Sequence, residues 1–137
     1  MKKIGTVSLY LGALFMAGFF GSPAVFANES AVEIEAPTKA KTGEEIIIVL
    51  HVSHDGNNFL HHTNRVELRI NGEMVKEWEY GTFSKPEAED FSVSFSYPTK
   101  QDLEIEAEAF CNLHGSKNTD AKTVSVEDAQ SNGNNRQ

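Results

Sequence analysis

Residues 103–109 read LEIEAEA, in which apolar residues and glutamates alternate without interruption. This period of two is typical of a β-strand that packs one face on a core and leaves the other face in water. An antiparallel sheet accommodates such half-buried strands, whereas an all-parallel sheet needs strands buried on both faces. The segment therefore indicates a fold built from antiparallel strands.

The same pattern recurs on both sides of this stretch. Residues 71–72 are Asn-Gly, a pair that adopts the positive φ angles of a type I′ hairpin turn, so we expect the segments before and after it to pair. Residues 45–53 read EIIIVLHVS, a nearly continuous apolar run that predicts a strand buried on both faces. The expected strands span residues 32–35, 45–53, 65–70, 74–80, 91–97, 102–110 and 123–126.

About seven short strands, with turn residues between them and no convincing helical pattern, predict an all-β fold. The spacing is typical of an immunoglobulin-like antiparallel β-sandwich. The chain has one cysteine, so the core of this sandwich must hold without an internal disulfide. We expect four aromatic side chains in that core, namely Trp78, Phe83, Phe91 and Phe95.

The N-terminus has the features of an export signal. Met1-Lys2-Lys3 is followed by an apolar stretch over residues 4–21 and by Val25-Phe26-Ala27, with small residues at the positions that a signal peptidase reads. An uncleaved membrane anchor is the alternative, but the glycines within the stretch disfavour it. We predict a signal peptide at residues 1–27, a domain at residues 28–126 and a disordered polar tail at residues 127–137. The mature protein would be exported, periplasmic or otherwise extracytoplasmic, and not stably inserted in a membrane.

The mature chain is strongly acidic. Removal of Lys2 and Lys3 leaves 10 basic residues against 20 acidic ones, a net charge of −10. Such a surface repels nucleic-acid phosphates and anionic lipids, which disfavours both as partners. A basic redox partner would instead be attracted, although acidic surfaces often serve only solubility.

Cys111 begins the string Cys111-Asn112-Leu113-His114-Gly115. A single exposed thiol outside the cytoplasm would oxidise or cross-link, so a bound metal is the simplest way to protect it. Thiolate and imidazole together suit iron, copper or zinc, whereas magnesium and calcium prefer oxygen ligands.

The other four histidines, His51, His54, His61 and His62, lie within 12 residues of one another. They occupy the end of a predicted strand and the loop that follows it, whose residues 55–60 are rich in turn formers. Taken alone, this cluster is equally compatible with a solvated polar loop. Because Cys111 also lies at a strand end, the two segments could converge at one end of the sandwich.

The string CNLHG, with the alternating strand before it and the histidine loop upstream, resembles the iron-binding domain of superoxide reductase, also called desulfoferrodoxin or neelaredoxin. The resemblance spans about residues 41–126. It implies a mononuclear iron site in which Cys111 is the axial thiolate. Three imidazoles, from His54, His61 and His114, are the other ligands that it implies.

Two departures from this family are visible in the sequence. His54 and His61 are seven residues apart where the family has six, and Asp55 replaces a proline. The family's upstream Glu-Lys-His string, which supplies a further imidazole and an anion-attracting lysine, is missing. His51 or His62 could fill the vacant ligand position, and Lys39 or Lys41 could guide the anion.

The resemblance implies that iron reduces superoxide to hydrogen peroxide, with no catalytic residue beyond the metal site. One cysteine cannot build a second, four-cysteine iron centre, so an external protein must donate the electron. Two alternatives remain open. The same four ligands could hold copper or zinc without catalysis, or the domain could be a metal-free interaction module, because residues 36–53 resemble the carrier subunit of the thiosulfate-oxidation complex. The sequence does not indicate the oligomeric state.

Overall fold

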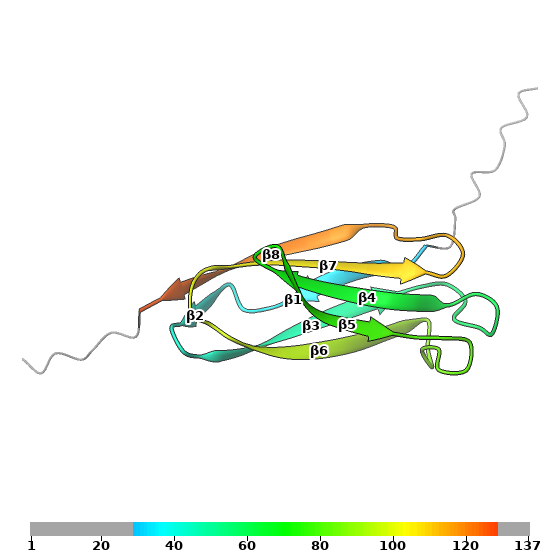
Figure 1. The fold of residues 1–137 in the computed structure, drawn as a ribbon, viewed down its shortest axis with the longest axis horizontal. Helices are drawn as coiled ribbons and strands as arrows, with labels where there is room; N and C mark the ends of the chain where they lie inside the picture. The colour runs from blue at the N-terminus through cyan, green and yellow to red at the C-terminus, as the bar shows by residue number, and fades with distance from the viewer. Residues whose placement is uncertain (1–28, 129–137) are drawn as a thin grey trace, which may run out of the picture.

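The computed structural model describes residues 29–128. Their strands form a sandwich of two sheets, as alternating apolar and polar side chains predict (Figure 1). One sheet has the strand order β1-β3-β6 and the other β2-β8-β7-β4-β5, and only the β2–β8 pair is parallel. The strands are β1 (Ala31–Glu35), β2 (Lys39–Lys41), β3 (Glu45–Ser53), β4 (Thr63–Ile70), β5 (Glu73–Glu79), β6 (Asp90–Pro98), β7 (Leu103–Cys111) and β8 (Thr119–Glu127). The predicted all-β, immunoglobulin-like sandwich is confirmed.

The core lies between the sheets and consists almost entirely of aliphatic side chains. Ile48 and Leu50 of β3 are fully buried against the other sheet's inner face, to which Leu68 and Ile105 belong. These side chains come from alternate positions of their strands, as the period of two requires. Burial of this apolar surface is the main stabilisation available to a domain whose one cysteine forms no disulfide.

Two expectations about the core are wrong. β3 is buried on one face only, since its outward-facing Ile47 is 63% exposed. Phe83 is 95% exposed, while Trp78, Phe91 and Phe95 are half-buried and pack on the margin of the core rather than within it. Aliphatic side chains already fill the space between the sheets, so the aromatic rings cover its edges.

The predicted hairpin between residues 65–70 and 74–80 is confirmed as the pair β4 and β5. Its turn residues have positive φ angles, 52° at Asn71 and 83° at Gly72, as a type I′ turn requires. The Asn71 side-chain oxygen also accepts a hydrogen bond from the backbone N–H of Glu104, which ties this turn to β7.

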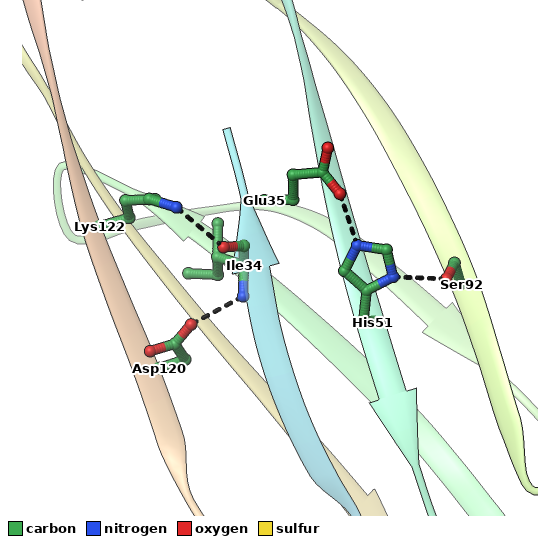
Figure 2. Close-up of polar contacts among 6 residues, drawn as sticks. All are labelled: Ile34, Glu35, His51, Ser92, Asp120 and Lys122. Carbon is green, nitrogen blue, oxygen red and sulfur yellow. Dashed lines mark hydrogen bonds and ion pairs between the residues drawn. The ribbon is translucent and has the colours of Figure 1, made fainter. Parts of the chain in front are cut away.

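The outer edge of β1 is satisfied by side chains rather than by another strand. Figure 2 shows the Asp120 carboxylate accepting from the Ile34 N–H at 2.7 Å and the Lys122 ammonium donating to the Ile34 carbonyl at 3.2 Å. Asn118 likewise bonds both backbone groups of Val32. Alternate residues of the β8 region therefore connect the two sheets along one side of the sandwich.

Three connections lie together at one end of the sandwich, on the right in Figure 1: the β3–β4 loop (54–62), the β5–β6 loop (80–89) and the β7–β8 loop (112–118). β2 lies at the opposite end, beside the last residues of β8. There the Lys39 ammonium donates to Glu127 at 2.7 Å, and this hydrogen bond raises the pKa of Lys39 and lowers the pKa of Glu127.

β8 includes Glu127, one residue more than the predicted domain contains. The predicted signal peptide and residues 129–137 of the predicted tail lie outside the described residues. Within residues 29–128, no helix has the length and apolar character needed to cross a membrane.

Candidate metal centre

Cys111 is held at the end of β7 by a tight turn. Its backbone N–H donates to the Gly115 carbonyl at 2.7 Å, and the Gly115 N–H donates back to the Cys111 carbonyl at 3.2 Å. Gly115 has a φ of 85°, a conformation that glycine adopts readily because it has no Cβ. The turn brings the His114 Nδ1 to 3.8 Å from the Cys111 sulfur.

The thiol is shielded from water and faces a hydrogen-bond donor. Cys111 is 5% exposed, and the backbone N–H of Leu113 donates to its sulfur at 3.4 Å. Such a bond modifies how strongly the sulfur would donate to a metal. The Gly115 N–H bonds the Cys111 carbonyl and not the sulfur.

The histidine loop is folded back on itself by two asparagines. The Asn58 N–H donates to the His61 carbonyl at 2.7 Å, and the Asn58 side-chain oxygen accepts from the His61 N–H at 2.9 Å. Asn57 Oδ1 accepts from the Thr63 N–H at 2.8 Å and lies 2.9 Å from His54 Nδ1. Because that oxygen can only accept, His54 Nδ1 carries the hydrogen and the Nε2 lone pair is left for a metal.

These two loops bring three of the four sequence-predicted ligands into one group and place the fourth, His114, beside two of them. His61 Nε2 lies 3.2 Å from His54 Nε2 and 3.0 Å from His114 Nδ1. The ligand atoms of His54, His61 and Cys111 all lie within 4.8 Å of one another. One thiolate and three imidazoles are a donor set for iron, copper or zinc, so these residues fit a transition metal.

Asn112 connects the cysteine loop to the histidine loop. Its backbone N–H donates to the His62 carbonyl, and its side-chain oxygen accepts from the His62 N–H, each at 3.0 Å. Its side-chain amide donates to the Leu60 carbonyl at 3.0 Å. Asn112 therefore fixes the backbone on both sides of His61, a role that its place in the motif string does not reveal.

The structure does not bring the two additional candidate histidines into the group of converging donor atoms. His51 lies on the outer face of β3, where its Nε2 is 2.7 Å from a Glu35 carboxylate oxygen and its Nδ1 is 2.9 Å from the Ser92 hydroxyl (Figure 2). His62 is 3% exposed, and its buried Nδ1 has no hydrogen-bond partner.

The expectation that Lys39 or Lys41 guides an anion to the metal is wrong. Both residues belong to β2, which pairs with Ser125–Glu127 of β8, whereas Cys111 ends the neighbouring β7 at the other end. β7 alone separates the two ends by about 25 Å, at roughly 3.3 Å per residue. These lysines lie too far away to contact an anion at the centre.

The sequence of residues 27–120 matches the family model described as desulfoferrodoxin. The chain belongs to the desulfoferrodoxin family. This confirms the resemblance seen in the CNLHG string and the histidine loop. Among curated proteins, none matches the sequence significantly.

Solved structures agree with this family. A superoxide reductase (neelaredoxin) from Ignicoccus hospitalis is 26% identical, with a TM-score of 0.59, over 77% of this chain and 89% of that one. The sulfur carrier protein SoxY from Chlorobium limicola is 14% identical, with a TM-score of 0.52, over 70% of this chain and 78% of that one. The second likeness shows only the shared sandwich, since one fold supports many functions.

Proposed function

We propose that the mature chain is an exported mononuclear non-haem iron protein that reduces superoxide to hydrogen peroxide with electrons from an external donor protein. One observation supports this most directly: His54, His61 and Cys111 present their ligand atoms to one point, and His114 contacts two of them. Membership of the desulfoferrodoxin family makes iron the metal of choice for this donor set.

The burial of the ligands gives the centre an inner and an outer side. Cys111 and His54 are buried, whereas His61 is half-buried and His114 is exposed. A small anion would therefore approach from the side of His61 and His114, while the sulfur donates from within. Bound ferrous iron would supply one electron to superoxide, which with two protons becomes hydrogen peroxide.

The protons must come from outside the converging group. That group, as far as residues 29–128 show it, consists of imidazoles and a thiol and contains no carboxylate or amine. Water has access through the exposed His114 side and is the donor that we expect. Lys39 and Lys41 lie at the opposite end of the sandwich, so neither of these two lysines would attract the anion to the centre.

Zinc or copper binding without catalysis is the second candidate. Three imidazoles and one thiolate make four protein ligands, the number that a closed structural zinc site uses. The missing upstream histidine is what favours this candidate, because it leaves the chain without the family's fifth protein ligand.

Metal analysis of protein purified without oxygen separates these candidates. We expect one iron per chain, a visible thiolate-to-iron band after oxidation, and loss of that band when the ferric protein is reduced. Mixing the ferrous protein with a pulse of superoxide should produce the same band at a rate proportional to protein concentration. A colourless protein with zinc, or an iron protein that is inert to superoxide, would contradict the proposal.

Three variants assign the ligands. Cys111→Ser should abolish the visible band, and His114→Ala should lower iron content. His51→Ala is the matched control, since this histidine lies on the outer face of β3 with Glu35 and Ser92 as its partners, and it should keep full iron content and reactivity. Unchanged metal content in Cys111→Ser and His114→Ala would remove every metal hypothesis for this site.

Export rests on the sequence of residues 1–27. Expression of the full chain in a bacterium should yield a secreted or periplasmic product that begins at Asn28, as determined by N-terminal sequencing. A full-length product that remains with the membrane fraction would favour the uncleaved anchor instead.

A further inference from the structure

Exposed apolar side chains gather around the candidate metal centre. Within the described residues, six large hydrophobic side chains are exposed, and four of them lie in the three loops at the metal end. We call these four the apolar rim: Phe59 (55% exposed), Leu60 (73%), Phe83 (95%) and Leu113 (62%). Stability of the fold does not explain the exposure of these four side chains, because they lie outside the hydrophobic core.

The rim is continuous with the exposed side of the centre. Leu60 directly precedes His61, Leu113 directly precedes His114, and Asn112 ties the two loops together through the Leu60 carbonyl. The rings of Phe59 and Phe83 pack edge to face with their centroids 5.6 Å apart. The β5–β6 loop is therefore part of the same surface, which borders the two ligands most accessible from solvent.

Acidic residues surround this surface. Four acidic residues, Asp55, Glu87, Glu89 and Asp90, are exposed in or beside the same loops, whereas the basic residues there are the exposed Lys117 and the half-buried Lys85. A chain with a net charge of −8 before processing adds a long-range field of the same sign. An apolar centre with a charged border is the usual composition of a transient protein interface.

We propose that the apolar rim is the docking surface for a small redox protein with an apolar contact face bordered by lysine and arginine. This inference rests on the proposed function, which needs an external electron donor. A second copy of this chain fits less well, because two acidic borders would repel and a symmetric contact would cover the ligand side that superoxide must reach.

A basic cytochrome c serves as the probe. Stopped-flow mixing measures electron exchange between the iron-loaded protein and cytochrome c, started in both directions by combining the reduced form of one with the oxidised form of the other. We expect the second-order rate constant to fall steeply as salt rises from low to physiological concentration, since opposite charges attract the partners. A rate independent of salt would contradict the acidic border's role.

The double variant Phe59→Ser with Phe83→Ser tests the rim itself. We expect electron exchange with cytochrome c to slow about tenfold or more, as for loss of aromatic contacts at the centre of an interface. The double variant Ile47→Ser with Met74→Ser is the control, because it removes two exposed apolar side chains from β3 and β5 away from the metal end. Equal slowing in both double variants, or no slowing in either, would overturn the inference.

Two further measurements keep this inference separate from the proposed function. The reaction of each ferrous variant with superoxide should equal that of the unmodified protein, since Phe59 and Phe83 are not among the ligands. If the unmodified protein is inert to superoxide, the proposed function fails and the docking inference falls with it. If it reacts normally and only the rim variant lacks its expected effect, docking alone is wrong. A dimer that dissociates on rim substitution would identify the rim as a self-contact and also overturn the inference.

Discussion

Asn57 shows how a residue that binds no metal can determine the geometry of the site. Its Oδ1 faces His54 Nδ1 and the Thr63 N–H, while its side-chain amide donates to the Ala88 carbonyl at 2.7 Å. One side chain therefore orients a ligand and joins the β3–β4 loop to the β5–β6 loop. Partners of this kind fix the tautomer and ring orientation of a metal-binding histidine.

Replacing Asn57 with alanine should weaken iron binding about 10- to 100-fold, because His54 loses the acceptor that holds its Nε2 toward the centre. Competition with a chelator of known affinity measures the effect. Asn57→Asp keeps an acceptor oxygen and should retain most of the affinity. If the alanine and aspartate variants bind iron equally well, Asn57 does not orient His54.

The converging cysteine and histidines were easier to recognise in the sequence than the asparagines that hold their loops together. Cysteine and histidine are rare here and have few other roles at strand ends, so Cys111 and His114 could be recognised from residue type and spacing. Asn57 and Asn112 could not, since asparagine is common in turns and its contacts depend on how two distant loops meet. The burial of His62, with its unpartnered Nδ1, was also not predictable from a loop histidine pair.

Among the strands, β8 differs most from its prediction. The predicted strand covers residues 123–126, whereas β8 begins at Thr119. The first half of β8 was missed because it is polar and does not pack on the core. Asn118, Asp120 and Lys122 instead bond the backbone of β1. β2 was missed because its three residues are too few to show a period of two. The burial of β3 was overestimated because its outer face is apolar in sequence but is not covered by another element.

Asp120→Ala should destabilise the domain by about 1–2 kcal/mol, because the partly buried Ile34 N–H loses its acceptor. For a domain of this size, each kcal/mol of destabilisation lowers Tm by roughly 4–8 °C. Thermal unfolding of the mature domain measures the change, and hydrogen exchange at the Ile34 amide locates it.

Glu104→Ala provides the control, since it removes an exposed carboxylate from β7 of the same sheet. It should leave both Tm and the protection of the Ile34 amide unchanged. If the Ile34 amide of Asp120→Ala remains as protected as in the unmodified protein, backbone pairing with β3 alone holds β1 in place.

In the whole molecule, the residues that stabilise the fold are separate from the residues of the candidate metal centre. The aliphatic core and the Lys39–Glu127 pair lie away from the loops that carry the ligands, the apolar rim and the acidic border. The fold class was predictable because the period of two is repeated in nearly every strand. The convergence of two loops about 50 residues apart in sequence was not predictable, since it depends on sheet order and register.

Because the ligands come from two loops that only the folded chain brings together, iron should stabilise the native state. At a free iron concentration 100 times the Kd, binding adds about 2.7 kcal/mol to the free energy of unfolding. For a domain of about 100 residues this corresponds to a rise in Tm of roughly 10–20 °C. Anaerobic thermal unfolding with and without ferrous iron measures this rise in Tm.

The rise in Tm should shrink as pH falls, because imidazole and thiol bind a metal only when deprotonated. Cys111→Ser should show a smaller rise, and His51→Ala the full one. An equal rise in Cys111→Ser and the unmodified protein would place the stabilising metal outside this centre.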